Sequence, residues 1–109
     1  MTLRLAHITF DCHNPISLSA FWSAALGWPV DPEPSEYFAT IGFPSRPESN
    51  TWMFIRVPEA KTTKNRMHVD LSSNDRPGDV ARLISLGAEH VGDYDEFGHQ
   101  WTTLRDPEG

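Results

Sequence analysis

One pattern occurs twice in this sequence, and the repetition constrains the fold more than any other feature. A strand-like segment that opens on His7 is followed by a helical segment, and the same order returns from His68. A single strand–helix–strand unit cannot bury its own apolar face, so we expect two copies to pack together into one core. The alternative interpretation is chance recurrence, because strand–helix pairs are common in α+β domains.

The first copy, at about residues 1–57, combines a half-buried strand with a helix and further strands. Apolar and polar residues alternate over Leu3–Cys12, which is typical of a strand with one buried face. Asn14 and Pro15 predict the start of a helix, and Gly27 predicts its end. The segments predicted after it are a short strand at Trp28–Val30, a strand at Glu36–Gly42, turns at Phe43–Asn50 and a strand at Thr51–Val57.

The second copy, at about residues 67–109, repeats this order after a polar crossover at Pro58–Arg66. Its predicted segments are a strand at Met67–Ser72, a helix at Asp75–Gly87, and strands at Ala88–Tyr94 and His99–Arg105 joined by a turn at Asp95–Gly98. A chain of 109 residues is the size of one domain. We therefore predict a single domain over residues 1–109.

The polar faces of the two opening strands predict a shared binding site. If the copies pack around a pseudo-two-fold axis, their apolar faces lie under the helices and their polar faces point into a common concavity. The predicted lining residues are His7, Thr9 and Asp11 from the first strand, His68, Asp70 and Ser72 from the second, and Trp52, Phe54, Arg56, Trp101 and Thr103 from later strands. Met53, Ile55 and Val57 are assigned to the helix-covered face. Arg56 would favour an anionic or polar group on the ligand.

Two histidines on neighbouring strands suggest a metal site. Neutral imidazoles suit a divalent ion such as Zn²⁺, Mn²⁺, Fe²⁺ or Ni²⁺, and a carboxylate would complete a site open to a substrate oxygen. We therefore predict His7 and His68 as ligands, whereas the alternative is that each is a hydrogen-bonded structural histidine. Asp11 and Asp70 could orient these imidazoles, act as bases or bind turn amides.

Composition excludes several classes of function. The formal net charge is −6, with no basic stripe to bind phosphates, so we expect no nucleic-acid partner. No segment approaches the roughly 18 apolar residues of a membrane span, nor does the N-terminus resemble a signal peptide, so we expect a cytoplasmic protein without membrane contact. Cys12 is the single cysteine, which excludes an internal disulfide.

In order and spacing, the motifs resemble the vicinal oxygen chelate superfamily, in particular its glyoxalase-like, bleomycin-resistance-like branch. The resemblance covers essentially the whole chain and rests on the His7 strand, Asn14-Pro15, Ala20-Phe21-Trp22, Leu26-Gly27, His68-Val69-Asp70-Leu71, Leu86-Gly87-Ala88 and Asp106-Pro107-Glu108-Gly109. It implies an α+β fold of two tandem βαβββ modules that form a curved mixed-sheet cup, usually completed by homodimerisation. The last strand of the second module would be absent, because the sequence ends at the Asp106-Pro107-Glu108-Gly109 turn.

The resemblance also implies two functional hypotheses. In metal-using members, such as glyoxalase I, extradiol dioxygenases and fosfomycin-modifying enzymes, the positions that match His7 and His68 are ligands, and a carboxylate ligand follows the closing turn. The first hypothesis is a metal-dependent lyase, isomerase or dioxygenase-like enzyme acting on a vicinal-oxygen or aromatic substrate. The second is a metal-free binding protein of the bleomycin-resistance type, with Trp52, Phe54 and Trp101 as stacking surfaces. A domain that mainly dimerises or regulates a partner is a third reading.

Overall fold

A computed structural model describes residues 3, 5–42 and 51–109 of the chain, which form two compact units. The first unit extends to Ala60 and includes Glu108, and the second comprises Lys61–Pro107 with Gly109. The predicted turns at Phe43–Asn50 and the first residues of the predicted Leu3–Cys12 strand lie wholly or partly outside the described residues.

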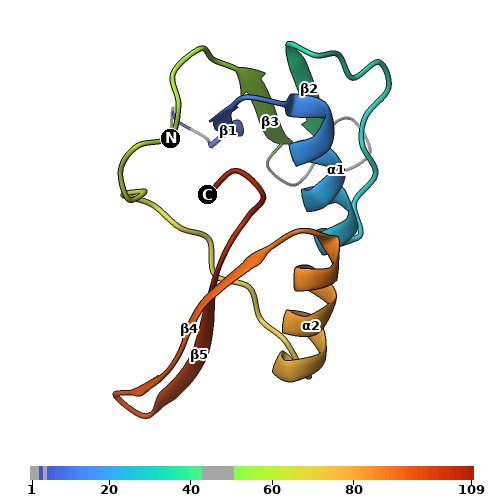
Figure 1. The fold of residues 1–109 in the computed structure, drawn as a ribbon. Helices are drawn as coiled ribbons and strands as arrows, with labels where there is room; N and C mark the ends of the chain where they lie inside the picture. Colours follow the sequence, from blue (N-terminus) through green and yellow to red (C-terminus); the bar gives the residue numbers. More distant parts are fainter. Residues whose placement is uncertain (1–2, 4, 43–50) are drawn as a thin grey trace. The chain divides into compact units, whose positions relative to one another are not determined.

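The first unit is a mixed three-stranded sheet with one helix (Figure 1). Its elements are β1 (His7–Cys12), α1 (Pro15–Leu26), β2 (Phe38–Ile41) and β3 (Thr51–Arg56). The strand order is β1-β3-β2, with β1 parallel and β2 antiparallel to the central β3. The predicted short strand at Trp28–Val30 is reduced to a single bridge between Val30 and Ile41.

Helix α1 begins and ends where its capping residues predict. The Asn14 side chain accepts a hydrogen bond from the Ser17 backbone N–H at 3.2 Å, and Pro15 occupies the first turn, where its missing N–H costs nothing. Gly27 adopts a left-handed conformation with φ of 73°, and its N–H donates to the Ser23 carbonyl at 2.9 Å. These caps satisfy backbone groups that would otherwise be orphaned at the helix ends.

Aromatic side chains from α1 and the sheet make the core of the first unit. The Phe54 ring is completely buried and lies 5.1 Å from the Phe10 ring, centroid to centroid. Trp52 meets Trp22 of α1 edge to face at 5.3 Å. The remaining buried apolar residues of this core are Cys12, Leu18, Phe21, Ala39 and Ile41. The cluster fixes α1 on one face of the sheet, since large aromatic surfaces dominate the burial energy of so small a unit.

The second unit contains helix α2 (Arg76–Leu86) and a hairpin of β4 (Glu89–Glu96) and β5 (His99–Arg105). The predicted strand at Met67–Ser72 was wrong, because these residues form no strand. In the first unit the opening strand is held by a parallel ladder with β3. Among the described residues of the second unit only β4 and β5 pair, so the Met67–Ser72 backbone has no equivalent ladder to join.

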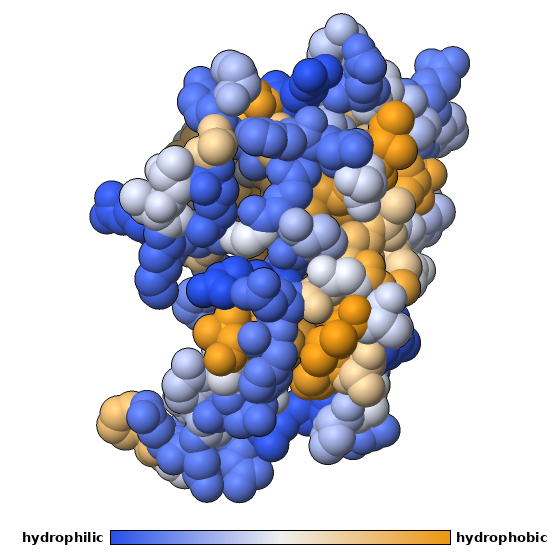
Figure 2. Space-filling view, viewed as in Figure 1, coloured by the Kyte–Doolittle hydropathy of each residue, from blue (hydrophilic) through white to orange (hydrophobic). Residues whose placement is uncertain are grey.

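Helix α2 is amphipathic, yet none of its residues is buried. Ile84 is 43% exposed and Leu86 is 38% exposed. Figure 2 shows apolar side chains at the surface over α2. The described part of the second unit therefore has little core of its own. No helix among the described residues is both long and apolar enough to cross a membrane.

Asp93 in the β4–β5 hairpin gives a pH-dependent prediction. A hydrogen bond from the Thr102 hydroxyl (2.8 Å), followed by one from His90, holds the pKa of Asp93 below its ordinary value. A depressed carboxyl pKa stabilises the folded state above the unfolded-state pKa, and this contribution is lost as the pH falls through the folded-state pKa. We expect Thr102→Val to move the Asp93 pKa back up, measured by NMR titration of its carboxyl carbon.

The neighbouring threonine provides the control for this titration. Thr103 follows Thr102 in β5, so its side chain points to the other face of the hairpin. We expect Thr103→Val to leave the Asp93 titration unchanged. Equal pKa values in the wild type and Thr102→Val would contradict the assigned cause.

Candidate functional site

Helix α1 covers one face of the first-unit sheet, and among the described helices and strands of this unit none covers the opposite face, which we call the open face. Strand alternation places Ile8, Phe10, Trp52 and Phe54 on the covered side. The open face carries His7, Thr9 and Asp11 from β1, Phe38 and Thr40 from β2, and Met53 and Ile55 from β3. His7, Thr9 and Asp11 are exposed, whereas Met53 and Ile55 are only partly exposed. This open face combines polar groups at its edge with apolar groups at its centre.

His7 and Asp11 both lie on the open face but are far apart. They are four residues apart on one strand, so their Cα atoms are about 13 Å apart. Asp11 therefore cannot orient the His7 imidazole by a direct hydrogen bond. The predicted placement of both side chains on the polar face of the opening strand agrees with the structure, and their roles stay predictions.

The face predicted for the central strand β3 was wrong. Trp52 and Phe54 were assigned to the pocket, but Trp52 is 7% exposed and Phe54 is 0% exposed, and both pack toward α1. Met53 and Ile55 lie on the open face instead. The physical reason is volume: the space between one helix and a three-stranded sheet is filled best by the largest rings available.

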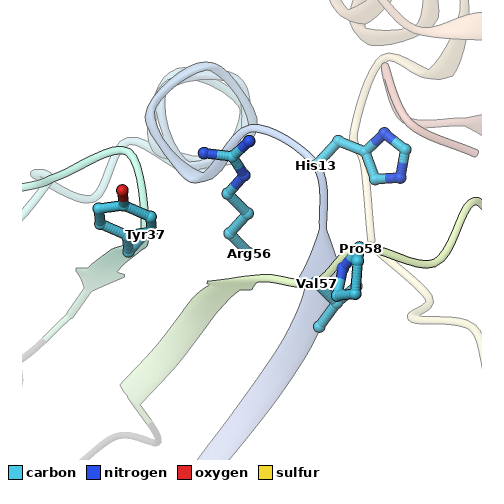
Figure 3. Close-up of a pocket in the computed structure, with 5 residues that line it drawn as sticks. All are labelled: His13, Tyr37, Arg56, Val57 and Pro58. Atoms are coloured by element: carbon cyan, nitrogen blue, oxygen red, sulfur yellow. The ribbon is translucent and has the colours of Figure 1, made fainter.

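Arg56, at the end of β3, lines a pocket of about 410 Å³ (Figure 3). The other lining residues are His13, Tyr37, Val57 and Pro58. The Arg56 guanidinium carbon lies 5.7 Å from the centroid of the Tyr37 ring, within the range of a cation–π contact. His13 lines this pocket, and its ring Nε2 is 3.0 Å from the Glu59 carbonyl oxygen.

Sequence reasoning missed Tyr37 as a neighbour of Arg56. The two residues are brought together by the β2–β3 ladder, in which the Arg56 N–H donates to the Tyr37 carbonyl at 3.0 Å. The available signal was the pair of strands separated by turns, which predicts a hairpin. Its register depends on residues in the connection, and a one-residue shift would have placed Tyr37 on the other face.

The second unit holds the remaining predicted site residues. His68 Nδ1 lies 3.0 Å from Asp70 Oδ1, and both side chains are well exposed. Trp101 stacks on Tyr94 across the hairpin, with ring centroids 5.4 Å apart, and remains 37% exposed. Asp70 is therefore placed to orient His68, and Trp101 offers one partly open ring face.

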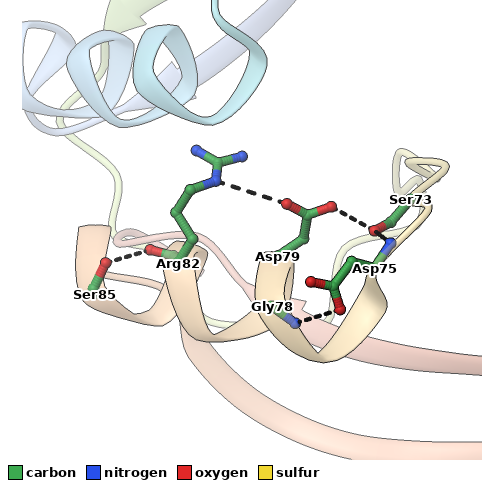
Figure 4. Close-up of polar contacts among 6 residues, drawn as sticks. All are labelled: Ser73, Asp75, Gly78, Asp79, Arg82 and Ser85. Atoms are coloured by element: carbon green, nitrogen blue, oxygen red, sulfur yellow. Dashed lines mark hydrogen bonds and ion pairs between the residues drawn. The ribbon is translucent and has the colours of Figure 1, made fainter.

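A cluster of polar groups at the start of α2 is structural (Figure 4). The Asp75 carboxylate accepts a hydrogen bond from the Gly78 N–H at 3.1 Å, which caps the helix. Asp79 accepts a hydrogen bond from the Ser73 hydroxyl and faces the Arg82 guanidinium at 3.8 Å. These groups satisfy one another and the helix end, which accounts for their positions without a ligand.

The family that the sequence resembles often uses a divalent metal, so the question is whether the described side chains could hold such an ion. Among the described residues there is no group of three or more histidine, cysteine, aspartate or glutamate side chains arranged to hold a metal ion. The oriented imidazole of His68 suits a ligand, and His7 is exposed on the open face. These two donors alone do not make a complete metal site.

A family model for the glyoxalase-like domain matches residues 7–109. The chain belongs to the glyoxalase-like domain family. None of the curated protein sequences gives a significant match. The match confirms the resemblance to the vicinal oxygen chelate superfamily that the order and spacing of the sequence motifs indicated.

Solved structures share the fold of this glyoxalase-like domain. A glyoxalase/bleomycin resistance protein/dioxygenase family enzyme from Burkholderia phytofirmans PsJN matches 97% of the chain and 92% of its own, with 17% identity and a TM-score of 0.75. For a hypothetical protein from S. aureus, the match covers 100% of this chain and 90% of the S. aureus chain, with 15% identity and a TM-score of 0.74. For the oxidase ChaP-H2, the match covers 100% of this chain and 89% of the oxidase chain, with 19% identity and a TM-score of 0.69.

These likenesses confirm the predicted α+β glyoxalase-like fold. The first unit shows a strand, a helix, the bridge at Val30 and two further strands, in the order predicted for a module. The curved cup built from two tandem modules remains a prediction.

Proposed function

We propose that this glyoxalase-like domain binds a small organic molecule on the open face of the first-unit sheet. The observation that carries the proposal is that α1 covers only one face, while the other presents His7, Thr9 and Asp11 beside Met53 and Ile55. Apolar side chains at the centre of a face give contact area, and polar groups at its edge give orientation. Such a surface suits a flat ligand that carries oxygen substituents.

Family membership supports a small-molecule ligand. The printed names of the related structures include an enzyme of the glyoxalase, bleomycin resistance and dioxygenase family and an oxidase. Proteins of these classes act on or bind small molecules, and we propose the same general property for this chain. A vicinal-oxygen or aromatic ligand is the class that the open face fits, with the His7 imidazole as a hydrogen-bonding partner for an oxygen.

The test uses catechol, an aromatic compound with two neighbouring oxygens, in an NMR titration of backbone amides. We expect shifts centred on His7–Asp11 and on the facing residues of β2 and β3. His7→Ala should weaken binding about 10-fold, since it removes one hydrogen bond and a ring contact. His99→Ala, which removes an exposed histidine from β5, should leave the affinity unchanged.

Two results would overturn this assignment. The first is a set of catechol shifts that avoids β1 altogether. The second is an equal loss of affinity in His7→Ala and His99→Ala. Both variants replace exposed side chains, so neither is expected to unfold the domain.

A metal-dependent form of the same function is favoured by the His68–Asp70 contact. Hydrogen bonding of Nδ1 to a carboxylate fixes the tautomer that leaves Nε2 free to ligate, a common arrangement around metal-binding histidines. Bound Zn²⁺, Mn²⁺, Fe²⁺ or Ni²⁺ would polarise a substrate oxygen. Lyase, isomerase or dioxygenase-like chemistry would follow only with further ligands.

Elemental analysis tests the metal-dependent form. If these histidines are ligands, protein purified without chelator should carry a divalent metal, and the His7→Ala, His68→Ala double variant should carry much less. Equal metal content in the two proteins would refute ligation by this pair and leave the metal-free binding function.

We also propose that the protein is a homodimer located in the cytoplasm. Homodimerisation follows from the usual assembly of the family, and light scattering would measure it. The cytoplasmic location carries over the expectation from the sequence analysis, and cell fractionation would test it.

A further inference from the structure

The Arg56 pocket lies on a different side of the first-unit sheet from the proposed ligand face. Arg56 follows Trp52 and Phe54 at alternating positions of β3, so its side chain shares their side of the sheet. In Figure 3 its guanidinium group extends upward from the end of β3, between Tyr37 and His13. The pocket therefore cannot be part of the His7 face and needs its own explanation.

The charge in this pocket is uncompensated. Within the described residues, Arg56 makes a cation–π contact with Tyr37 and no ion pair with a carboxylate. Glu108, which belongs to the first unit, has its carboxylate committed to the backbone N–H groups of His13 (2.6 Å) and Asn14 (2.9 Å). A guanidinium with free donors beside a pocket attracts an anionic oxygen, because its planar fork matches a carboxylate.

The rest of the lining favours an organic anion over a bare inorganic one. Val57 and Pro58 supply apolar surface, and the Tyr37 ring supplies an aromatic face next to the guanidinium. The volume of about 410 Å³ is within the range of small-molecule sites. We propose that this pocket is a second binding site, for a small carboxylate with an apolar body held by Arg56.

The experiment compares three probes by NMR titration of the full chain. Benzoate has both the charge and the apolar body, acetate lacks the body, and benzamide lacks the charge. We expect benzoate to bind most tightly and to shift the amides of Tyr37, Arg56 and Val57. Arg56→Gln should weaken benzoate binding 10-fold or more, and Arg56→Lys should give an intermediate loss, because lysine keeps the charge without the planar fork.

Arg82→Gln provides the matched control. It removes an arginine charge from α2 in the second unit and should leave benzoate binding unchanged. The proposal is overturned if benzamide binds as tightly as benzoate, if Arg56→Gln and Arg82→Gln have equal effects, or if benzoate shifts only β1 residues. The last outcome would assign benzoate to the open face, so failure of this site is distinguishable from failure of the proposed function.

Discussion

Replacing Phe54 with alanine is expected to lower the free energy of unfolding of the first unit by about 3–5 kcal/mol. The ring is 0% exposed and stacks on Phe10 at 5.1 Å, at the centre of the central strand. Its removal loses the transfer free energy of the ring and leaves a cavity between α1 and the sheet. Urea denaturation followed by circular dichroism measures the loss. For a domain at the low end of ordinary stability, about 5 kcal/mol, this loss would remove most of the free energy of unfolding.

Phe38→Ala is the control for this prediction. Phe38 lies in the same sheet but on the open face, where it is 41% exposed. Its replacement should cost only about 1 kcal/mol, because less surface leaves water on folding. A loss in Phe54→Ala no larger than in Phe38→Ala would show that the aromatic cluster does not hold the unit together.

Thr40→Val is expected to destabilise the first unit by about 1–3 kcal/mol, although it conserves shape. The Thr40 hydroxyl donates to Asp31 Oδ2 at 2.7 Å, and Asp31 is 8% exposed. Valine removes the donor and leaves a buried carboxylate oxygen without this hydrogen bond, which costs part of its desolvation free energy. Urea denaturation measures the change.

Thr9→Val isolates the effect of the hydrogen bond from that of the substitution. Thr9 is exposed on β1 of the same sheet, and valine suits a strand at least as well as threonine does. We expect a change within about 0.5 kcal/mol. If both threonine variants lose the same stability, the Asp31 contact contributes nothing beyond the general cost of replacing threonine in this sheet.

Local signals in the sequence predicted the helices and most strands well. Helix α1 begins after Asn14 and ends before Gly27, as predicted, because capping depends on a few neighbouring residues. The strand at His99–Arg105 also has the predicted bounds. Met67–Ser72 shows the limit of such reasoning. Its alternation of apolar and polar residues is that of a strand, but a strand also requires a partner with free backbone groups.

The candidate site was predicted less completely than the fold. The polar face of β1 follows from strict alternation, which placed His7 and Asp11 correctly. For β3, alternation gave two equally regular faces, and the choice between them depended on which rings fill the space beneath α1. That choice is a property of packing in three dimensions. The same is true of the Arg56 pocket, whose members come from three separate segments.

The distribution of tryptophan gives the two units separate optical signals. Trp22, Trp28 and Trp52 lie in the first unit, where Trp52 contacts both of the others with ring centroids 5.3 and 5.9 Å apart. Trp101 is in the second unit and is 37% exposed. Near-ultraviolet circular dichroism, which depends on rings held in fixed asymmetric surroundings, is therefore dominated by the first unit. The red-shifted part of the emission, which comes from indoles in contact with water, includes Trp101, so one unfolding sample distinguishes the loss of order in each unit.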